Sequence, residues 1–270
     1  MIVFITSLRH PWNANSYSGV LALLEQTLRS VCRQTSDQFR VLVVCNEPPA
    51  ASPHPAVSFL TVHFPPPSPR RQASTGMEPL RLDRGCKYLM GLLHVRAWAP
   101  DHVMFFDADD FVSNRLAALS AADPTAPGWY VHDGYVYDTE LGRLGTLQGF
   151  NRICGTGHIV RHALFDLPED LPEDASQPLI LERVDREYLM TILGSHRWIA
   201  GHLASRGTPL APLPFPGAVY HVGHGENHTS RLVSHALWTG GAEGLSRIAV
   251  AHLHAIRDEF TLPGFPAPLA

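Results

Sequence analysis

The sequence predicts an α/β fold built on a mostly parallel β-sheet, and three observations support this prediction. Short apolar runs at residues 2–6, 41–45 and 102–106 are typical of strands that are buried on both faces. Apolar residues at helical spacing lie between the first two runs and again before the third. A strand, a helix and a strand in this order indicate βαβ units, whose strands pair in parallel.

The composition fits a globular chain with a large core. The 270 residues are 45% hydrophobic, which is enough for one large domain or two small ones. A net charge of -4 argues against nucleic acid as a partner. No apolar run is long enough for a membrane-spanning helix, and the first residues resemble a strand more than a signal peptide. The four cysteines form no CxxC pair and are expected to be free thiols. We therefore expect a cytoplasmic protein, either free or peripheral at a membrane.

The front half of the chain follows the βαβ pattern in order. Apolar residues recur at helical spacing from Leu21 to Val31 and from Cys86 to Ala97, and both stretches predict amphipathic helices. Between them, residues 48–69 contain eight prolines. This segment predicts a surface crossing with one short strand at residues 57–62.

Beyond residue 110 the pattern changes. Residues 129–137 alternate apolar and polar side chains, as antiparallel strands do. Residues 166–178 predict an acidic, Pro-rich loop, and a short helix is expected from Val184 to Leu193, ended by Gly194. We predict one domain over residues 1–230, followed by a C-terminal helical segment and a Pro-rich tail over residues 231–270.

Three carboxylates, Asp107, Asp109 and Asp110, directly follow the apolar run at residues 102–106. In open α/β sheets, ligands bind at the carboxyl ends of the strands. Like charges this close repel one another, and a divalent cation would offset them. Carboxylate oxygens suit Mg²⁺ or Mn²⁺. The alternative is a solvated acidic turn that caps the next helix.

The stretch from Phe105 to Asp110 resembles the Asp-x-Asp motif of GT-A-fold glycosyltransferases, in the Asp-Ala-Asp-Asp form of family 2. Residues 24–35 resemble the first helix of that family, and residues 39–44 fall where its second strand falls. The similarity covers about residues 2–230. It implies a GT-A-type, Rossmann-like, mostly parallel sheet with a mixed acceptor-side half. It also implies a nucleotide diphosphate sugar as donor, with a UDP-sugar favoured, and a glycan or glycolipid as acceptor.

The same resemblance implies roles for individual residues. Asp109 is expected to bind the metal, Mn²⁺ or Mg²⁺, with Asp110 assisting it and Asp107 near the donor's ribose. Four further donor contacts are expected: Ser7, Arg9, Asn46 and Lys87. The chain departs from the family pattern at the first of these, in the turn Thr6–Pro11, and at Asn46, where the family has acidic residues that contact the base. For Arg9 and Lys87, an ordinary salt bridge is the alternative.

An inverting transfer needs a general base that takes the proton of the acceptor hydroxyl. In the family, a carboxylate at the start of a late helix does this. Asp185 matches best, and Glu187 and Glu182 are rivals. An acid in a first helical turn also stabilises the helix dipole without any catalytic role.

The segment from Tyr220 to Ser230 is rich in histidine and resembles the family's late loop that closes over the diphosphate. By that resemblance, His224 is expected to complete the metal shell, followed by His221. The alternative is a polar surface loop that contains histidines by chance.

These observations predict a metal-dependent, inverting hexosyltransferase. Two other interpretations stay open. One is a non-catalytic nucleotide-sugar or glycan-binding module on the same fold, which would bind without turnover. The other is a metal-dependent hydrolase, in which the aspartates and histidines form a mixed oxygen and nitrogen site and water is the acceptor.

Overall fold

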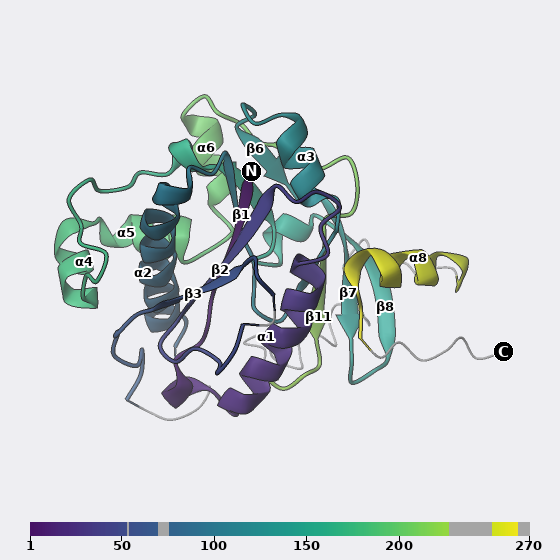
Figure 1. The fold of residues 1–270 in the computed structure, drawn as a ribbon, viewed down its shortest axis with the longest axis horizontal. Coiled ribbons are helices and arrows are strands. Elements are labelled where there is room, and N and C mark those ends of the chain that lie inside the picture. Colours follow the sequence, from purple (N-terminus) through teal and green to yellow (C-terminus); the bar gives the residue numbers. More distant parts are fainter. Residues whose placement is uncertain (53, 70–75, 227–249, 264–270) are drawn as a thin grey trace.

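A computed structural model of the chain describes residues 1–52, 54–69, 76–226 and 250–263 (Figure 1). The strands of its main sheet are β1 (Ile2–Ser7), β2 (Phe39–Cys45), β3 (Val57–Thr61), β4 (His102–Phe105), β6 (Gly128–Tyr130), β9 (His158–Arg161) and β10 (Ala211–Pro212). A smaller sheet contains β5 (Phe111–Val112), β7 (Asp133–Asp138), β8 (Arg143–Gln148) and β11 (Ala218–Val222). The α-helices are α1 (Tyr17–Val31), α2 (Met77–Val95), α3 (Leu116–Ala122), α4 (Gln177–Arg183), α5 (Arg186–Tyr188), α6 (Ile199–Ser205) and α8 (Val250–Phe260). Short helical turns are η1 (Pro11–Asn13), η2 (Arg96–Trp98), η3 (Phe150–Arg152), η4 (His162–Leu164) and η5 (Leu189–Leu193).

The main sheet has the strand order β10-β6-β9-β4-β1-β2-β3. Its pairs are parallel except at β9, which runs antiparallel to both β4 and β6. In the smaller sheet, ordered β5-β11-β7-β8, β11 pairs in parallel with β7 and the other pairs are antiparallel. The predicted α/β class, with a mostly parallel sheet and a mixed second half, is confirmed.

Both faces of the main sheet are covered by helices, and this explains the unbroken apolar runs. Along β1, Ile2 and Phe4 pack in a cluster with α1, whereas Val3 and Ile5 pack in a cluster with α2 on the opposite face. All four side chains are fully buried. A strand buried on both faces needs apolar residues at every position, so its sequence does not alternate.

Helix α2 begins at Met77, well before the start that was predicted at Cys86. Its first turns contain Pro79, and Asp83 and Arg84 face a cavity that is described below. Polar residues on the inner side of these turns interrupt the apolar periodicity. The amphipathic pattern therefore becomes visible only from Cys86 onward.

The chain reverses its progress across the main sheet between β1 and β4. Strands β2 and β3 lie on one side of β1, and β4 lies on the other, with Ile5 opposite Phe105. At such a reversal the loops that follow the two strands diverge and leave a crevice at the carboxyl ends. Residues 7–9 follow β1 and residues 107–110 follow β4, so both groups of predicted site residues start at this crevice.

Helix α8 packs against the smaller sheet, next to β7 and β8 (Figure 1). Ile256 and Phe260 contribute to a buried cluster with Phe111 and Tyr137. The Glu259 carboxylate also accepts hydrogen bonds from Ser113 Oγ at 2.5 Å and Arg115 Nε at 3.0 Å. The domain boundary predicted at residue 230 lies outside the described residues and stays a prediction.

Among the described residues, none of the helices has the length and hydropathy that crossing a membrane requires.

Candidate functional site

A cavity of about 300 Å³ lies at the carboxyl ends of β1 and β4. One wall is formed by the turns after β1, β4 and β11 and by the start of α1. The other wall is formed by the first turns of α2 and by residues 194–197. The acidic, basic and histidine side chains on the cavity surface are Arg9, Arg81, Asp83, Arg84, Asp107, Asp109, His196, Arg197 and Glu226. The predicted residues Ser7, Arg9, Asp107 and Asp109 are therefore brought together.

Asp109 and His224 form a close pair beside this cavity. His224 Nε2 lies 3.0 Å from Asp109 Oδ2, and the His224 side chain is only 7% exposed. The backbone N–H of Glu226 donates to His224 Nδ1 at 3.3 Å. With Nδ1 as acceptor, Nε2 carries the ring proton and donates it to the carboxylate, so a metal ion bound here would replace that proton. A carboxylate oxygen and an imidazole nitrogen directed at one another are a donor pair that suits Mn²⁺ and other first-row divalent cations.

The pKa of Asp109 reflects two opposing influences. Burial alone would raise it, but the hydrogen bond from His224 and the charges of His224, His221 and Arg84 outweigh burial and lower the pKa below its ordinary value. The carboxylate therefore stays ionised at neutral pH, which is the form that binds a cation.

His221 supports the turn that carries Asp109. Its Nδ1 donates to the backbone carbonyl of Asp109 at 3.0 Å, and its ring stacks on Tyr137 with the centroids 5.4 Å apart. Burial, followed by the charge of His224, lowers the pKa of His221 to about 4. The imidazole is therefore neutral at physiological pH, and the centroids of the His221 and His224 rings lie 4.7 Å apart.

Asp110 is fully buried and connects three segments of the chain. Its Oδ2 accepts hydrogen bonds from Cys154 Sγ at 2.8 Å and Thr156 Oγ1 at 2.5 Å, and its Oδ1 accepts from the backbone N–H of His221 at 3.0 Å. Burial and the charge of Asp109 raise the pKa of Asp110 to about 7. With these three donors in place, Asp110 holds the turn that presents Asp109.

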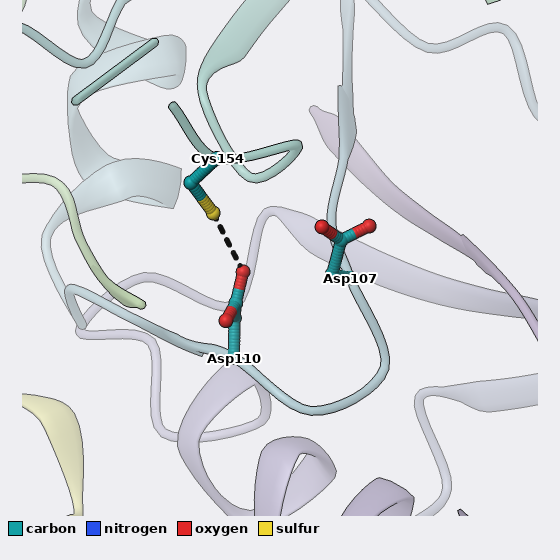
Figure 2. A group of neighbouring side chains, drawn as sticks. All are labelled: Asp107, Asp110 and Cys154. Carbon is teal, nitrogen blue, oxygen red and sulfur yellow. Dashed lines mark hydrogen bonds between the residues drawn. The ribbon is translucent and has the colours of Figure 1, made fainter. Parts of the chain in front are cut away.

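Asp107, Asp110 and Cys154 also offer a second arrangement that could hold a metal. One ligand atom from each lies within 4.8 Å of the others, and both carboxylates project from the same turn (Figure 2). Burial and the charge of Asp110 raise the pKa of the Cys154 thiol well above its ordinary value, which opposes the thiolate that a metal needs. Asp109 and His224, whose donor atoms face each other without a thiol, fit a hard divalent cation better.

Asp107 faces the opposite wall through an ion pair with Arg84 of α2. The loop before β9 approaches the same carboxylate so closely that a side chain at Gly155 would collide with it. The backbone N–H of Asp107 donates to Thr156 Oγ1 at 3.0 Å. Asp107 is thus held by α2 and by the loop before β9 while it lines the cavity.

Arg9 is fixed by Glu226, a residue that the sequence analysis did not single out. Arg9 donates to the Glu226 carboxylate at 3.0 Å and to its carbonyl oxygen at 2.8 Å. The same carboxylate accepts from the backbone N–H groups of Asn15 at 3.2 Å and Ser16 at 2.7 Å, just before α1. Glu226 therefore connects the turn after β1, the start of α1 and the turn after β11.

Two predicted donor contacts, Lys87 and Asn46, make hydrogen bonds within the fold. The Lys87 ammonium is fully buried and donates to Asp83 and to the Leu8 carbonyl, both at 2.8 Å. The Asn46 amide donates to the carbonyls of Val62 at 3.1 Å and Phe64 at 3.0 Å. Neither residue is among those that line the cavity, because these hydrogen bonds direct both side chains into the fold.

The residues predicted to supply the general base are not among the residues that line the cavity. Asp185 caps α5, where its carboxylate accepts from the backbone N–H groups of Glu187 at 3.3 Å and Tyr188 at 3.1 Å. Both Asp185 and Glu187 are exposed, and neither is among the described residues that line the cavity. This is the capping alternative that the sequence also allowed.

The structure adds several residues that the sequence analysis missed: Arg81, Arg84, His196, Arg197 and Glu226. For Arg81 and Arg84, a usable signal exists, since both precede Lys87 at helical spacing and face the side of α2 that points to the cavity. The others lie in loops, where no periodicity marks which side chains face inward.

No family model matches the chain, and no curated protein sequence matches it. Among solved structures, residues 1–349 of S. aureus TarS align at 12% identity with a TM-score of 0.39, covering 82% of this chain and 60% of that one. A longer TarS structure gives the same identity and TM-score over 36% of its length. A "putative nucleotide-diphospho-sugar transferase" from Desulfovibrio desulfuricans G20 aligns at 9% identity and a TM-score of 0.39, covering 95% of each chain.

This chain therefore spans less than two thirds of either TarS structure.

Proposed function

We propose that this chain is a metal-dependent glycosyltransferase that moves a hexose from a nucleotide diphosphate sugar, with UDP as the favoured nucleotide, to a hydroxyl of a glycan or glycolipid. The observation that carries the proposal is the Asp109–His224 pair beside the crevice between β1 and β4. Arg9 and Arg84 line the same cavity. A divalent cation and guanidinium groups are the charges that bind and offset a diphosphate.

Asp109 and His224 would hold the metal, Mn²⁺ or Mg²⁺, with His221 packed behind them. When bound, the metal would supply positive charge beside the diphosphate that leaves the sugar. Other residues of the chain hold these groups in position. Asp110 and His221 hold the Asp109 turn, and Glu226 holds Arg9 at the end of β1.

The test is calorimetric titration of UDP and GDP, with and without Mn²⁺, into the wild-type protein and into Asp109→Ala. We expect one nucleotide to bind only with Mn²⁺ and the variant to lose that binding. Glu140→Ala removes an exposed carboxylate outside the cavity and serves as the matched control. Equal metal-dependent binding by the wild type and Asp109→Ala would disprove the metal assignment.

Inversion of the anomeric centre, with Asp185 as base, remains part of the proposal by resemblance to family 2. A base must come within hydrogen-bonding reach of the proton that it removes. The acceptor hydroxyl would then have to reach the start of α5. If Asp185 is the base, Asp185→Asn lowers kcat by about 10²-fold or more while the cap is kept, and Glu187→Gln does not. Proton NMR of the first product formed gives the anomeric configuration.

A second candidate function is a nucleotide-sugar or glycan-binding module without catalysis, and one observation favours it. Each carboxylate on the described cavity surface has a basic partner: Asp83 with Lys87, Asp107 with Arg84, Asp109 with His224 and Glu226 with Arg9. None of these carboxylates is left unpaired to accept a proton from an acceptor hydroxyl. This candidate predicts metal-dependent nucleotide binding without product on any acceptor. The cytoplasmic location stays a prediction.

A further inference from the structure

Two of the arginines in the cavity have no carboxylate partner among the described residues. Four arginines line it: Arg9, Arg81, Arg84 and Arg197. Arg9 is paired with Glu226, and Arg84 with Asp107. Arg81 and Arg197 form no ion pair or side-chain hydrogen bond with any residue that the structure describes. The lining carboxylates equal the arginines in number, but Asp83 pairs with the buried Lys87 and Asp109 with His224.

The two unpaired arginines are held on one wall by a tight backbone contact. Gly194, which follows η5, packs against the first turns of α2, and a side chain there would collide with the carbonyl oxygen of Arg81. The next residues, Ser195 to Arg197, line the cavity directly after this contact. The contact therefore brings Arg197 to the same wall as Arg81.

His196 lies within the field of these arginines. Its Nε2 donates to the carbonyl of Arg152 at 3.3 Å, which fixes the ring. Burial, followed by the charges of Arg84, Arg197 and Arg81, lowers the pKa of His196 to about 4. A neutral imidazole whose pKa responds to three guanidinium groups indicates that their charges converge on this wall.

We propose that Arg81 and Arg197 form an anion subsite distinct from the diphosphate position at Asp109, and that it binds an oxyanion group, phosphate or carboxylate, on the acceptor. The proposal rests on the transferase function proposed above. Guanidinium groups match oxyanions through paired N–H donors. The donor's diphosphate already has the metal ligands, Arg9 and Arg84 available to it. Arg81 and Arg197 are the two guanidinium groups of the cavity without an ion-pair partner among the described residues, and we assign them to the acceptor.

The first experiment separates the two anion positions. Inorganic phosphate is titrated calorimetrically into protein saturated with UDP and Mg²⁺, for the wild type, Arg81→Gln and Arg197→Gln. Arg143→Gln removes an exposed arginine of β8, outside the cavity, and is the matched control. We expect phosphate to bind the UDP-loaded wild type and the control, and to bind each cavity variant about tenfold more weakly. UDP affinity should stay within about twofold throughout.

Two outcomes would overturn the subsite. Phosphate that no longer binds once UDP and Mg²⁺ are present would assign both arginines to the donor. Equal phosphate affinity in the wild type and both variants would show that the arginines bind no oxyanion. Failure of UDP itself to bind would instead refute the transferase proposal, and the same phosphate titration without UDP would still test the subsite.

The second experiment identifies the source of the oxyanion. Transfer is measured with a neutral methyl glycoside, its 6-phosphate and the matching uronic acid as acceptors. We expect at least one charged acceptor to have a KM about tenfold below that of the neutral one. Arg81→Gln and Arg197→Gln should remove this advantage and leave kcat unchanged. Equal KM values for all three acceptors in the wild type would contradict an acceptor subsite.

Discussion

The two walls of the cavity differ in how their charges are balanced. On the wall formed after β1, β4 and β11, each charged side chain is matched by another: Arg9 by Glu226 and Asp109 by His224. On the wall formed by α2 and residues 194–197, Arg81 and Arg197 have no carboxylate partner among the described residues. The first wall is preorganised by the protein itself. The second leaves its charge for a ligand to neutralise.

The largest expected effect is at Lys87, which connects the two walls by donating to Asp83 of α2 and to the carbonyl of Leu8 after β1. Lys87 is buried and neutralises Asp83, which lines the cavity. Lys87→Met leaves a buried carboxylate without its partner, and we expect it to lower the free energy of unfolding by about 3–5 kcal/mol. Urea unfolding measures this loss.

Replacing both partners, in Asp83→Leu with Lys87→Met, should recover most of that stability, because no unpaired charge is then buried. UDP affinity measured on the folded fraction of Lys87→Met should not change. A large loss of UDP affinity at unchanged stability would restore Lys87 as a donor contact.

A matched pair of substitutions tests the first wall. Asp109→Asn should lower transfer by about 10²-fold or more and leave stability nearly unchanged, since Asp109 is presented to the cavity. Asp110→Asn should lower the free energy of unfolding by about 1–3 kcal/mol, because three buried donors share that carboxylate. Kinetics with saturating Mn²⁺ and urea unfolding give the two values. The opposite pattern would exchange the roles of the neighbouring aspartates.

A smaller effect is expected at His158, a buried residue of β9 whose pKa is also lowered by the charge of His196 on the second wall. His158 is 3% exposed, and neither ring nitrogen has a hydrogen-bond partner among the described residues. Burial, then the charge of His196, lowers its pKa to about 3. His158→Leu should stabilise the fold by about 1 kcal/mol at pH 7, because it removes unsatisfied polar atoms.

The same residue gives the fold a dependence on pH. An unfolded histidine has a pKa of about 6.5, so the stability that the neutral ring allows is complete above that pH and is lost as the pH falls toward 3. The loss from His158 alone is about 2 kcal/mol at pH 5. Thermal unfolding at pH 7 and pH 5 should show a smaller decrease in His158→Leu than in the wild type. Equal decreases would mean that a group other than His158 causes the loss of stability at pH 5.

The sequence predicts the sheet better than it predicts the site. The apolar runs that form β1, β2 and β4 can be recognised in the sequence because both faces of these strands are buried. Position after β4 also identified the aspartate cluster. Nothing local distinguishes Asp109, which faces His224, from Asp110, which faces Cys154, because their partners lie more than 40 residues further along the chain.

The second wall was harder to predict for a different reason. Its arginines follow no apolar pattern, and their convergence depends on the packing of Gly194 against α2. The role of Asp185 is also difficult to predict from the sequence. A carboxylate that caps a helix and one that accepts a proton from a substrate look the same in a sequence.

The reversed strand β9 has a consequence for how the site assembles during folding. Because β9 runs against β4, the loop that precedes it arrives at the crevice edge and brings Cys154 and Thr156 to Asp110, over separations of 44 and 46 residues. The bond from His221 spans 111 residues. Cys154, Thr156 and His221 all follow β4 in the chain, so during synthesis they emerge only after β1, β2 and β4 have done so. We therefore expect a nascent chain to hold β1, β2 and β4 in register before its carboxylate turn is ordered.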